Sequence, residues 1–191
     1  MVKEGREGLS SKGIFGPPVC LAGVNLKEPI AFPFLGGEVV IFTRSAPIAG
    51  HQNEDALGVF EWKRAVGVLA VADGLGGLPG GGAASQMMIE SLNSPLLAED
   101  IDPVTSCVKS VNKVLVRDGK GSGTTVTVLF VQGREISSYY VGDSTMLVVG
   151  RRGRIKLQTI PHSMVGRALS GGQLDEKSAM RHPERHVIHN M

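Results

Sequence analysis

The sequence predicts an α+β fold in which helices cover a mostly antiparallel sheet. Two apolar runs, 57–60 and 65–72, are separated by the polar stretch 61–64 and therefore form a hairpin. A second series of apolar and β-branched runs extends from residue 124 to residue 159, broken by short turns, and predicts an antiparallel meander. Helical periodicity marks two segments between these strands. Hairpin-connected strands with separate helices are typical of α+β domains, not of parallel doubly wound sheets.

Size and composition favour one cytoplasmic domain. The 191 residues are enough to bury a sizeable core. A formal net charge of +2 is too small to favour nucleic acid or an anionic membrane as a partner. The longest apolar run is too short to span a bilayer, and the N-terminus lacks the layout of a signal peptide. Cys20 and Cys107 do not make a disulfide framework.

The elements can be predicted in chain order. Residues 1–37 are rich in Gly, Pro and Ser, which predicts an irregular N-terminal extension. The domain itself is expected to occupy residues 38–191, and its first core strand is Glu38–Thr43. The hairpin follows, and after it comes a helix over 82–92 with an apolar face.

The second helix has clear ends. Asp102 is a good N-cap, Pro103 fits the first helical position and Gly119 stops the helix. We expect both helices on one face of the sheet. Beyond Gly123 the sequence predicts strands at 124–131, 135–141, 145–149 and 154–159, and short helices at 164–170 and 175–181.

Two acidic motifs flank the hairpin: Asn53-Glu54-Asp55-Ala56 before it and Ala72-Asp73-Gly74-Leu75-Gly76-Gly77 after it. The residue entering the first strand of an antiparallel hairpin lies beside the residue leaving the second, so Asp55 and Asp73 should be neighbours. Two close carboxylates repel each other unless a cation or a proton lies between them. Oxygen ligands of this kind suit Mg²⁺ or Mn²⁺. The alternative is that both are ordinary turn residues.

Taken together, the motifs resemble the bacterial form of the metal-dependent protein phosphatases, the PPM or protein phosphatase 2C family. The resemblance runs from about Val39 to the chain end. Beyond the two acidic motifs it rests on Gly80, Ala84-Ser85, Gly123-Thr124-Thr125, Val141-Gly142-Asp143-Ser144 and His182-Pro183-Glu184-Arg185-His186-Val187. It implies a four-layer αββα fold, an antiparallel β-sandwich flanked by helices, with metal ions in a cleft at one end.

The resemblance also implies roles for individual residues. Asp55 and Asp73 would hold two Mg²⁺ or Mn²⁺ ions, with the Gly74 carbonyl oxygen as a further ligand. Glu54 would orient a metal-activated water that hydrolyses phosphoserine or phosphothreonine in proteins. Asp143 would help to hold a third, weaker ion, or would only stabilise its tight turn. The implied partners are a phosphorylated protein and a cognate Ser/Thr kinase system.

The glycine-rich turn at 74–82 could instead cradle a nucleotide phosphate, as a similar turn does in dinucleotide-binding units. The spacing disfavours this, because Pro79 takes the place of the third glycine and no Gly-Lys-Ser/Thr follows. The late histidines, His182, His186 and His189, are expected to be structural, because Pro183 interrupts any helix that would align the first two.

Three departures from the family pattern leave a second function open. Gly50 stands where the family carries a phosphate-gripping Arg, for which Arg44 or His51 could substitute, and Pro161-His162-Ser163 replaces Asp-His-Ser. The two late aspartates that complete the family's metal pair do not occur before Met191. The chain is then either part of a longer phosphatase or a degenerate relative. Such a relative would bind phosphoproteins or act as a regulatory module.

Overall fold

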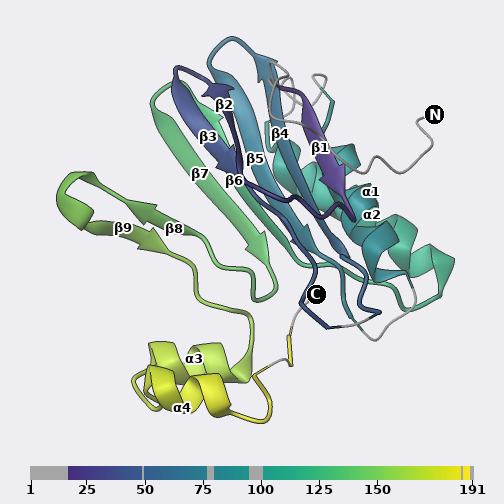
Figure 1. The fold of residues 1–191 in the computed structure, drawn as a ribbon, viewed down its shortest axis with the longest axis vertical. Coiled ribbons are helices and arrows are strands. Elements are labelled where there is room, and N and C mark those ends of the chain that lie inside the picture. Colours follow the sequence, from purple (N-terminus) through teal and green to yellow (C-terminus); the bar gives the residue numbers. More distant parts are fainter. Residues whose placement is uncertain (1–16, 49, 77–79, 95–100, 186, 190–191) are drawn as a thin grey trace.

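The computed structural model describes residues 17–48, 50–76, 80–94, 101–185 and 187–189 (Figure 1). Gly77 and Pro79 of the glycine-rich turn, and His186, lie outside these residues. The predicted α+β class is confirmed. The largest sheet has five antiparallel strands in the order β1-β4-β5-β6-β7. Their bounds are β1 Val19–Ala22, β4 Asp55–Lys63, β5 Val66–Asp73, β6 Val126–Gln132 and β7 Glu135–Val141.

The predicted hairpin forms the centre of this sheet as β4 and β5. Successive side chains of a strand point to opposite faces, and in β4 both faces are buried. Ala56, Phe60 and Trp62 point to one core, whereas Leu57 and Val59 point to another. Burial on both sides explains why these strands are continuous apolar runs.

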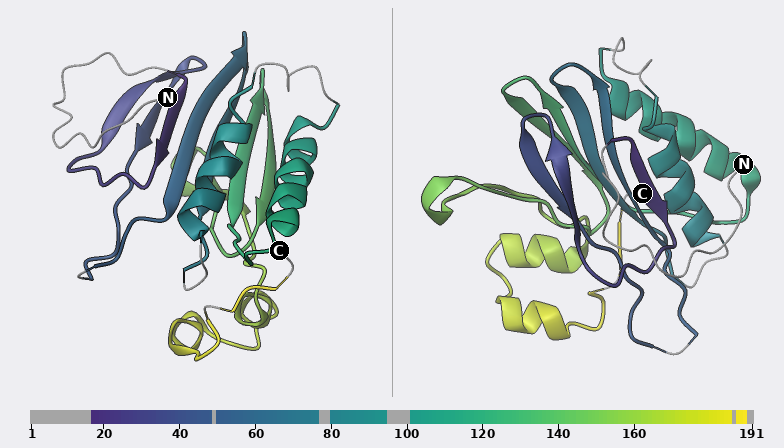
Figure 2. Two further views of the ribbon diagram at one scale, coloured as in Figure 1. Left: turned by 90° about the vertical axis from the view of Figure 1, so that its right-hand side faces the viewer. Right: turned by 45° about the horizontal axis from the view of Figure 1, so that its top comes forward.

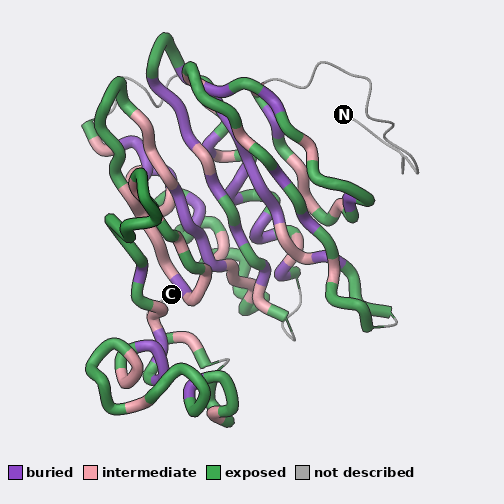
Figure 3. Tube along the Cα trace, turned by 60° about the vertical axis from the view of Figure 1, so that its left-hand side comes forward, coloured by how far each residue is buried: buried purple, intermediate pink, exposed green. Residues whose placement is uncertain are grey.

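The two predicted helices, α1 (Gly81–Ser91) and α2 (Pro103–Asp118), cover one face of the sheet (Figure 2). Met88, Ile89 and Val104 pack there against β4 and β5. The Trp62 indole Nε1–H donates to the Leu92 carbonyl oxygen at 2.9 Å, which fixes the end of α1 to the sheet. Figure 3 shows the resulting band of buried residues through the central strands.

The prediction of an irregular extension before residue 38 is wrong for the part that the structure describes. Besides β1, which pairs with β4, residues Ile30–Phe34 form β2, which pairs with β3 (Gly37–Ile41). Phe32, Phe34 and Ile41 of this hairpin pack on the sheet face opposite the helices. Tertiary packing therefore overrides the local bias of the Gly and Pro residues in this segment.

The predicted meander is also corrected. The strand that follows β7 does not pair with it. Instead, β8 (Leu147–Val149) and β9 (Ile155–Gln158) pair with each other in a separate two-stranded sheet. The turn before β8 lies against β6, where the Thr127 hydroxyl donates to the Ser144 carbonyl oxygen at 3.3 Å. The chain therefore crosses the sheet face instead of extending beside β7. A short 3₁₀ turn, Arg151–Gly153, connects β8 and β9.

Two short helices, α3 (Met164–Ser170) and α4 (Glu176–Arg181), follow as predicted and lie beyond the end of the sheet (Figure 1). Each begins at a side-chain cap. Ser163 Oγ accepts from the Gly166 amide at 2.9 Å, and Asp175 Oδ1 accepts from the Ser178 amide at 2.7 Å. No membrane-spanning helix is found among the residues that the structure describes.

The cap of α2 gives a stability prediction. Asp102 Oδ1 accepts a hydrogen bond from the Thr105 amide at 3.3 Å. The Asp102 carboxyl also bonds the Tyr139 hydroxyl. Burial raises the pKa of the Tyr139 phenol, and the Asp102 carboxyl raises it further. We expect Asp102→Ala to lower the free energy of unfolding by about 1–2 kcal/mol. Urea denaturation followed by circular dichroism measures it. Asp102→Asn keeps an acceptor at the cap and should lose less than half as much; equal losses would contradict the capping role.

Candidate metal centre

The two predicted aspartates meet at one end of the five-stranded sheet. Asp55 begins β4, Asp73 ends β5, and the two residues stand directly opposite each other in the antiparallel register. Their carboxyl groups come within hydrogen-bond reach. The prediction that they are neighbours is confirmed, and its cause is the hairpin register.

Negative charge accumulates at this end of the sheet. Loss of hydration raises the pKa of Asp73 from 3.8 to about 6, and the nearby carboxyl groups of Asp55, Asp143 and Glu54 act in the same direction. The Asp73 side chain is still exposed at the sheet end, so solvent screens part of this repulsion. Four acidic side chains from three separate segments thus act on one another here.

Asn53 holds the entry to β4. Its side-chain oxygen accepts from the Asp55 amide at 3.0 Å. Its Nδ2 group donates to the Val24 carbonyl oxygen at 2.7 Å and to the Thr43 hydroxyl at 3.0 Å. A buried amide bonded on both sides fixes the backbone from which the Asp55 carboxyl projects. The acidic motif placed Asn53 here, but its partners, 29 and 10 positions away, carry no local signal.

Glu54 lies beside the start of α1. The Ser85 hydroxyl donates to the Glu54 carbonyl oxygen at 2.5 Å, and the Gly74 amide donates to the same oxygen at 3.2 Å. Glu54 is only partly exposed, and its carboxylate oxygen Oε2 lies on the side of Gly76. The Glu54 main chain therefore joins the first acidic motif to the second.

Gly74 permits a close approach of backbones. A Cβ atom at this position would lie 2.4 Å from the carbonyl carbon and oxygen of Gly81 and 2.8 Å from the Glu54 carbonyl oxygen. Because real Cβ contacts are never so short, only glycine fits between the end of β5 and the start of α1. The backbone after Asp73 is thereby packed against the first turn of α1.

Thr125 connects the aspartate pair to the turn that carries Asp143. Its hydroxyl oxygen accepts from the Asp73 amide at 3.0 Å and lies 2.9 Å from the Ser144 hydroxyl. The Thr125 amide donates to the Asp73 carbonyl oxygen at 2.8 Å, and the residue is 1% exposed. Thr125 of the Gly123-Thr124-Thr125 motif thus supports the main chain at Asp73.

His162 supports the other side of the Asp143 turn. Its Nδ1 atom accepts from the Gly142 amide at 3.3 Å, its own amide donates to the Gly142 carbonyl oxygen at 2.9 Å, and its ring stacks on Tyr140. Gly142 has φ of 106°, where a side chain would also meet Thr125. Sequence reasoning noted only that Pro161 stands in place of the Asp of an Asp-His-Ser pattern, and missed this contact of His162.

The donor set fits a hard cation. The groups available are carboxylate oxygens and main-chain carbonyl oxygens, which suit Mg²⁺ or Mn²⁺ and not soft metals. No three His, Cys, Asp or Glu side chains within the described segments are close enough to form a metal cluster alone. Any cation held between Asp55 and Asp73 would therefore need main-chain oxygen and water as further ligands.

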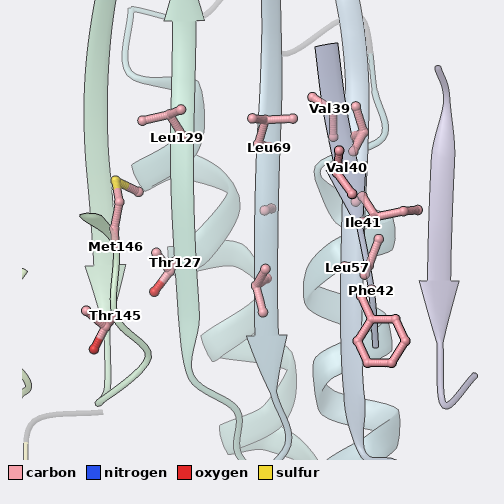
Figure 4. Close-up of a pocket in the computed structure, with 14 residues that line it drawn as sticks. Val39, Val40, Ile41, Phe42, Leu57, Leu69, Thr127, Leu129, Thr145 and Met146 are labelled. Atoms are coloured by element: carbon pink, nitrogen blue, oxygen red, sulfur yellow. The ribbon is translucent and has the colours of Figure 1, made fainter. Parts of the chain in front are cut away.

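An apolar groove of about 290 Å³ lies elsewhere, on the sheet face opposite the helices (Figure 4). It is bounded by β3 on one side and by Thr145 and Met146 on the other, with Leu69 and Leu129 on its floor. None of the side chains that line it is titratable.

A prediction tests the Thr125 connection. Thr125→Val keeps the shape but leaves the partly buried Asp73 amide without its hydroxyl acceptor, so we expect the free energy of unfolding to fall by about 1–2 kcal/mol. Thr125→Ser keeps the acceptor and should lose clearly less. Thermal denaturation at fixed pH compares the two; a valine variant as stable as the wild type would show that the hydroxyl is dispensable.

The sequence profile of the protein phosphatase 2C family matches residues 44–170, two thirds of the chain. The chain belongs to this family. It is 31% identical over 152 residues to the serine/threonine phosphatase stp of Listeria welshimeri, an alignment that covers 72% of this chain and 60% of that protein. The chain thus spans about 60% of the length of the curated phosphatase 2C relatives that it matches.

Solved structures agree. The fold superposes on serine/threonine phosphatase Stp1 from Staphylococcus aureus with a TM-score of 0.65 at 25% identity, over 97% of this chain and 68% of that one. It also superposes on the catalytic domain of the phosphatase PstP in complex with two manganese ions, with a TM-score of 0.56 at 25% identity, covering 71% and 60% of the two chains. Membership of the phosphatase 2C family therefore stands on sequence and on fold.

Gly50 is a departure from the phosphatase 2C pattern with a visible backbone cause. It has φ of 83°, in the left-handed region, where an arginine would be strained. Open space surrounds the place that a Cβ atom would take. The main chain at this turn is therefore shaped for glycine.

Proposed function

We propose that this chain carries the catalytic half-site of a metal-dependent protein phosphatase that hydrolyses phosphoserine and phosphothreonine in proteins. The observation that carries the proposal is the pair Asp55 and Asp73, opposed in the hairpin register within a chain of the phosphatase 2C family. Two carboxylates opposed in this way favour a cation between them. Mg²⁺ or Mn²⁺ is the proposed cofactor, with two ions at the pair and a third at Asp143.

In this proposal Asp55, Asp73 and the Gly74 carbonyl oxygen hold the ions. Bound divalent ions supply the charge that activates a water and screens the phosphoryl oxygens. Glu54 orients the attacking water, and Asp143 adds negative charge on the side where the β7–β8 turn closes the site. Asn53 fixes the main chain at Asp55, and Thr125 fixes the main chain at Asp73, through the hydrogen bonds described above. The proposed location is the cytoplasm, and the opposing enzyme is a Ser/Thr kinase.

A second function is favoured by a specific observation. Gly50 replaces the family's phosphate-gripping arginine in a turn shaped for glycine, and no group of three His, Cys, Asp or Glu side chains among the described residues could hold a metal ion. A chain of this kind could keep the fold and bind phosphoproteins without hydrolysing them. Both functions include binding of a phosphoprotein, but only the first includes hydrolysis of its phosphate.

The test is hydrolysis of p-nitrophenyl phosphate and of a phosphothreonine peptide at increasing Mn²⁺ concentration. We expect release of phosphate that saturates with Mn²⁺ and falls at least about a hundredfold in Asp55→Asn, because several kcal/mol of transition-state stabilisation depend on the metal. Isothermal calorimetry with Mn²⁺ runs in parallel. Peptide binding without turnover by a folded chain would support the regulatory function, and hydrolysis unchanged in Asp55→Asn would sink the proposed site.

A further inference from the structure

The segment from residue 144 to residue 174 has an unusual charge distribution. It contains the cations Arg151, Arg152, Arg154, Lys156 and Arg167 and has neither Asp nor Glu, although the whole chain has a formal net charge of only +2. Four of these cations lie within six positions, at the tip of the β8–β9 hairpin. Figure 1 shows that this hairpin projects away from the five-stranded sheet.

The tip cations are exposed and uncompensated. Arg151, Arg152, Arg154 and Lys156 are all exposed, and none of them makes an ion pair with another residue that the structure describes. The pleat gives the ribbon two different faces, since alternate residues of a strand point to opposite sides. Arg154 and Lys156 therefore share one face along β9, whereas Ile155 and Leu157 share the other.

The base of the hairpin is fixed beside the candidate metal centre. The Met146 amide donates to the Thr159 hydroxyl at 2.8 Å, and the Thr159 amide donates to the Met146 carbonyl oxygen at 3.1 Å. Asp143 lies three residues before this clamp. From Met146 to the tip at Arg151 is a strand length on the order of 17 Å, which an extended peptide covers in about five residues.

We propose that the tip of the β8–β9 hairpin is a docking surface for an acidic, extended segment of the protein substrate, placed more than about five residues from the phosphorylated side chain, because the hairpin alone spans that length. This rests on the proposed phosphatase function. The exposed cations of the tip complement the carboxylates of such a segment. The ribbon from 144 to 159 contains no aromatic residue on which a nucleic-acid base could stack. These features favour an acidic peptide over a single-stranded nucleic acid.

The experiment uses the full chain with Mn²⁺ and two phosphothreonine peptides. One carries four Glu residues beginning six positions from the phosphothreonine, and the other has Gln at the same places. We expect kcat/KM to be higher for the Glu peptide and the difference to vanish at high salt. In the variant Arg151→Glu, Arg154→Glu, Lys156→Glu the value for the Glu peptide should fall roughly tenfold, as expected for a few exposed ion pairs. Hydrolysis of p-nitrophenyl phosphate should stay unchanged.

The matched control is a second variant that makes the same charge change at another place in the molecule. Lys109→Glu, Lys113→Glu, Arg117→Glu alters three exposed cations of α2, on the opposite side of the sheet, and should leave the Glu preference intact. Equal loss in both variants would overturn the docking surface, because it would show an effect of net charge alone. A Glu preference that is absent from the wild type would also overturn it.

A second readout separates this proposal from the proposed catalysis. Fluorescence anisotropy with the Glu peptide, made without phosphate and measured without Mn²⁺, reports docking when no hydrolysis occurs. Binding that the hairpin variant loses and the α2 variant keeps supports the docking surface even if p-nitrophenyl phosphate is never hydrolysed. Tighter binding of a DNA duplex or of phosphatidylserine vesicles, lost in the same variant, would overturn the assignment to an acidic peptide.

Discussion

Asp73→Asn is expected to abolish Mn²⁺-dependent hydrolysis, with a loss of at least about a hundredfold, and at the same time to stabilise the metal-free chain at neutral pH. Asparagine keeps the size of the side chain but removes the charge that a divalent ion needs. It also removes a charge whose loss of hydration, together with repulsion from Asp55, Asp143 and Glu54, raises the pKa of Asp73. A residue that only terminated a strand would give neither effect.

The stability effect has a definite pH dependence. The pKa of Asp73 is about 6 in the folded chain against 3.8 ordinarily, so the folded state binds more protons between these values. The free energy of unfolding of the wild type therefore falls as the pH rises from about 4 to about 6. Because Asp73 is exposed and solvent screens the repulsion, we expect Asp73→Asn to be more stable by only about 1 kcal/mol above pH 6.

Urea denaturation in EDTA at pH 4 and pH 7 measures this difference. The two proteins should be nearly equal at pH 4, where the wild-type carboxyl is protonated, and should separate at pH 7. A matched control is Asp118→Asn at the exposed end of α2, which removes a carboxylate far from the cluster. A wild type more stable than Asp73→Asn at pH 7 in EDTA would contradict the carboxylate repulsion.

Gly74→Ala should destabilise the site by disturbing the packing of α1 against the end of β5. The added methyl carbon would lie 2.4 Å from the carbonyl carbon and oxygen of Gly81. These are backbone atoms, which cannot rotate away as a flexible side chain could. We expect a loss of about 3 kcal/mol in the free energy of unfolding. Mn²⁺-dependent activity should be lost as well, because α1 must move away from the end of β5. Differential scanning calorimetry with and without Mn²⁺ measures both effects.

Gly76→Ala is the matched control for this substitution. It adds the same methyl group two residues later in the same turn, where the nearest atom is Glu54 Oε2 at 3.7 Å, an ordinary contact with a flexible side chain. Its stability should stay within about 0.5 kcal/mol of the wild type. If both alanine variants were equally destabilised, backbone freedom in the turn would be the cause and not the close approach of α1.

Much of the fold could be predicted from local patterns. The bounds of α2 follow from Asp102 and Gly119, and the start of α3 from Ser163, because caps are local hydrogen-bonding signals. The opposition of Asp55 and Asp73 also follows from local information, since a short turn sets the hairpin register. The strands β1 and β2 were missed, because their Gly- and Pro-rich segment becomes ordered through packing on β4 and against β3.

The sequence by itself determined that this chain brings two carboxylates to one end of a hairpin, because strand register depends on residues close together in the chain. Only the tertiary structure decided what surrounds them. Asp143 influences the pKa of Asp73 from 70 positions away, the hydroxyl of Thr125 accepts from the Asp73 amide, and the β8–β9 hairpin leaves the sheet with its cations exposed. These contacts join residues distant in sequence, and their energies depend on burial and charge that arise only when the layers pack.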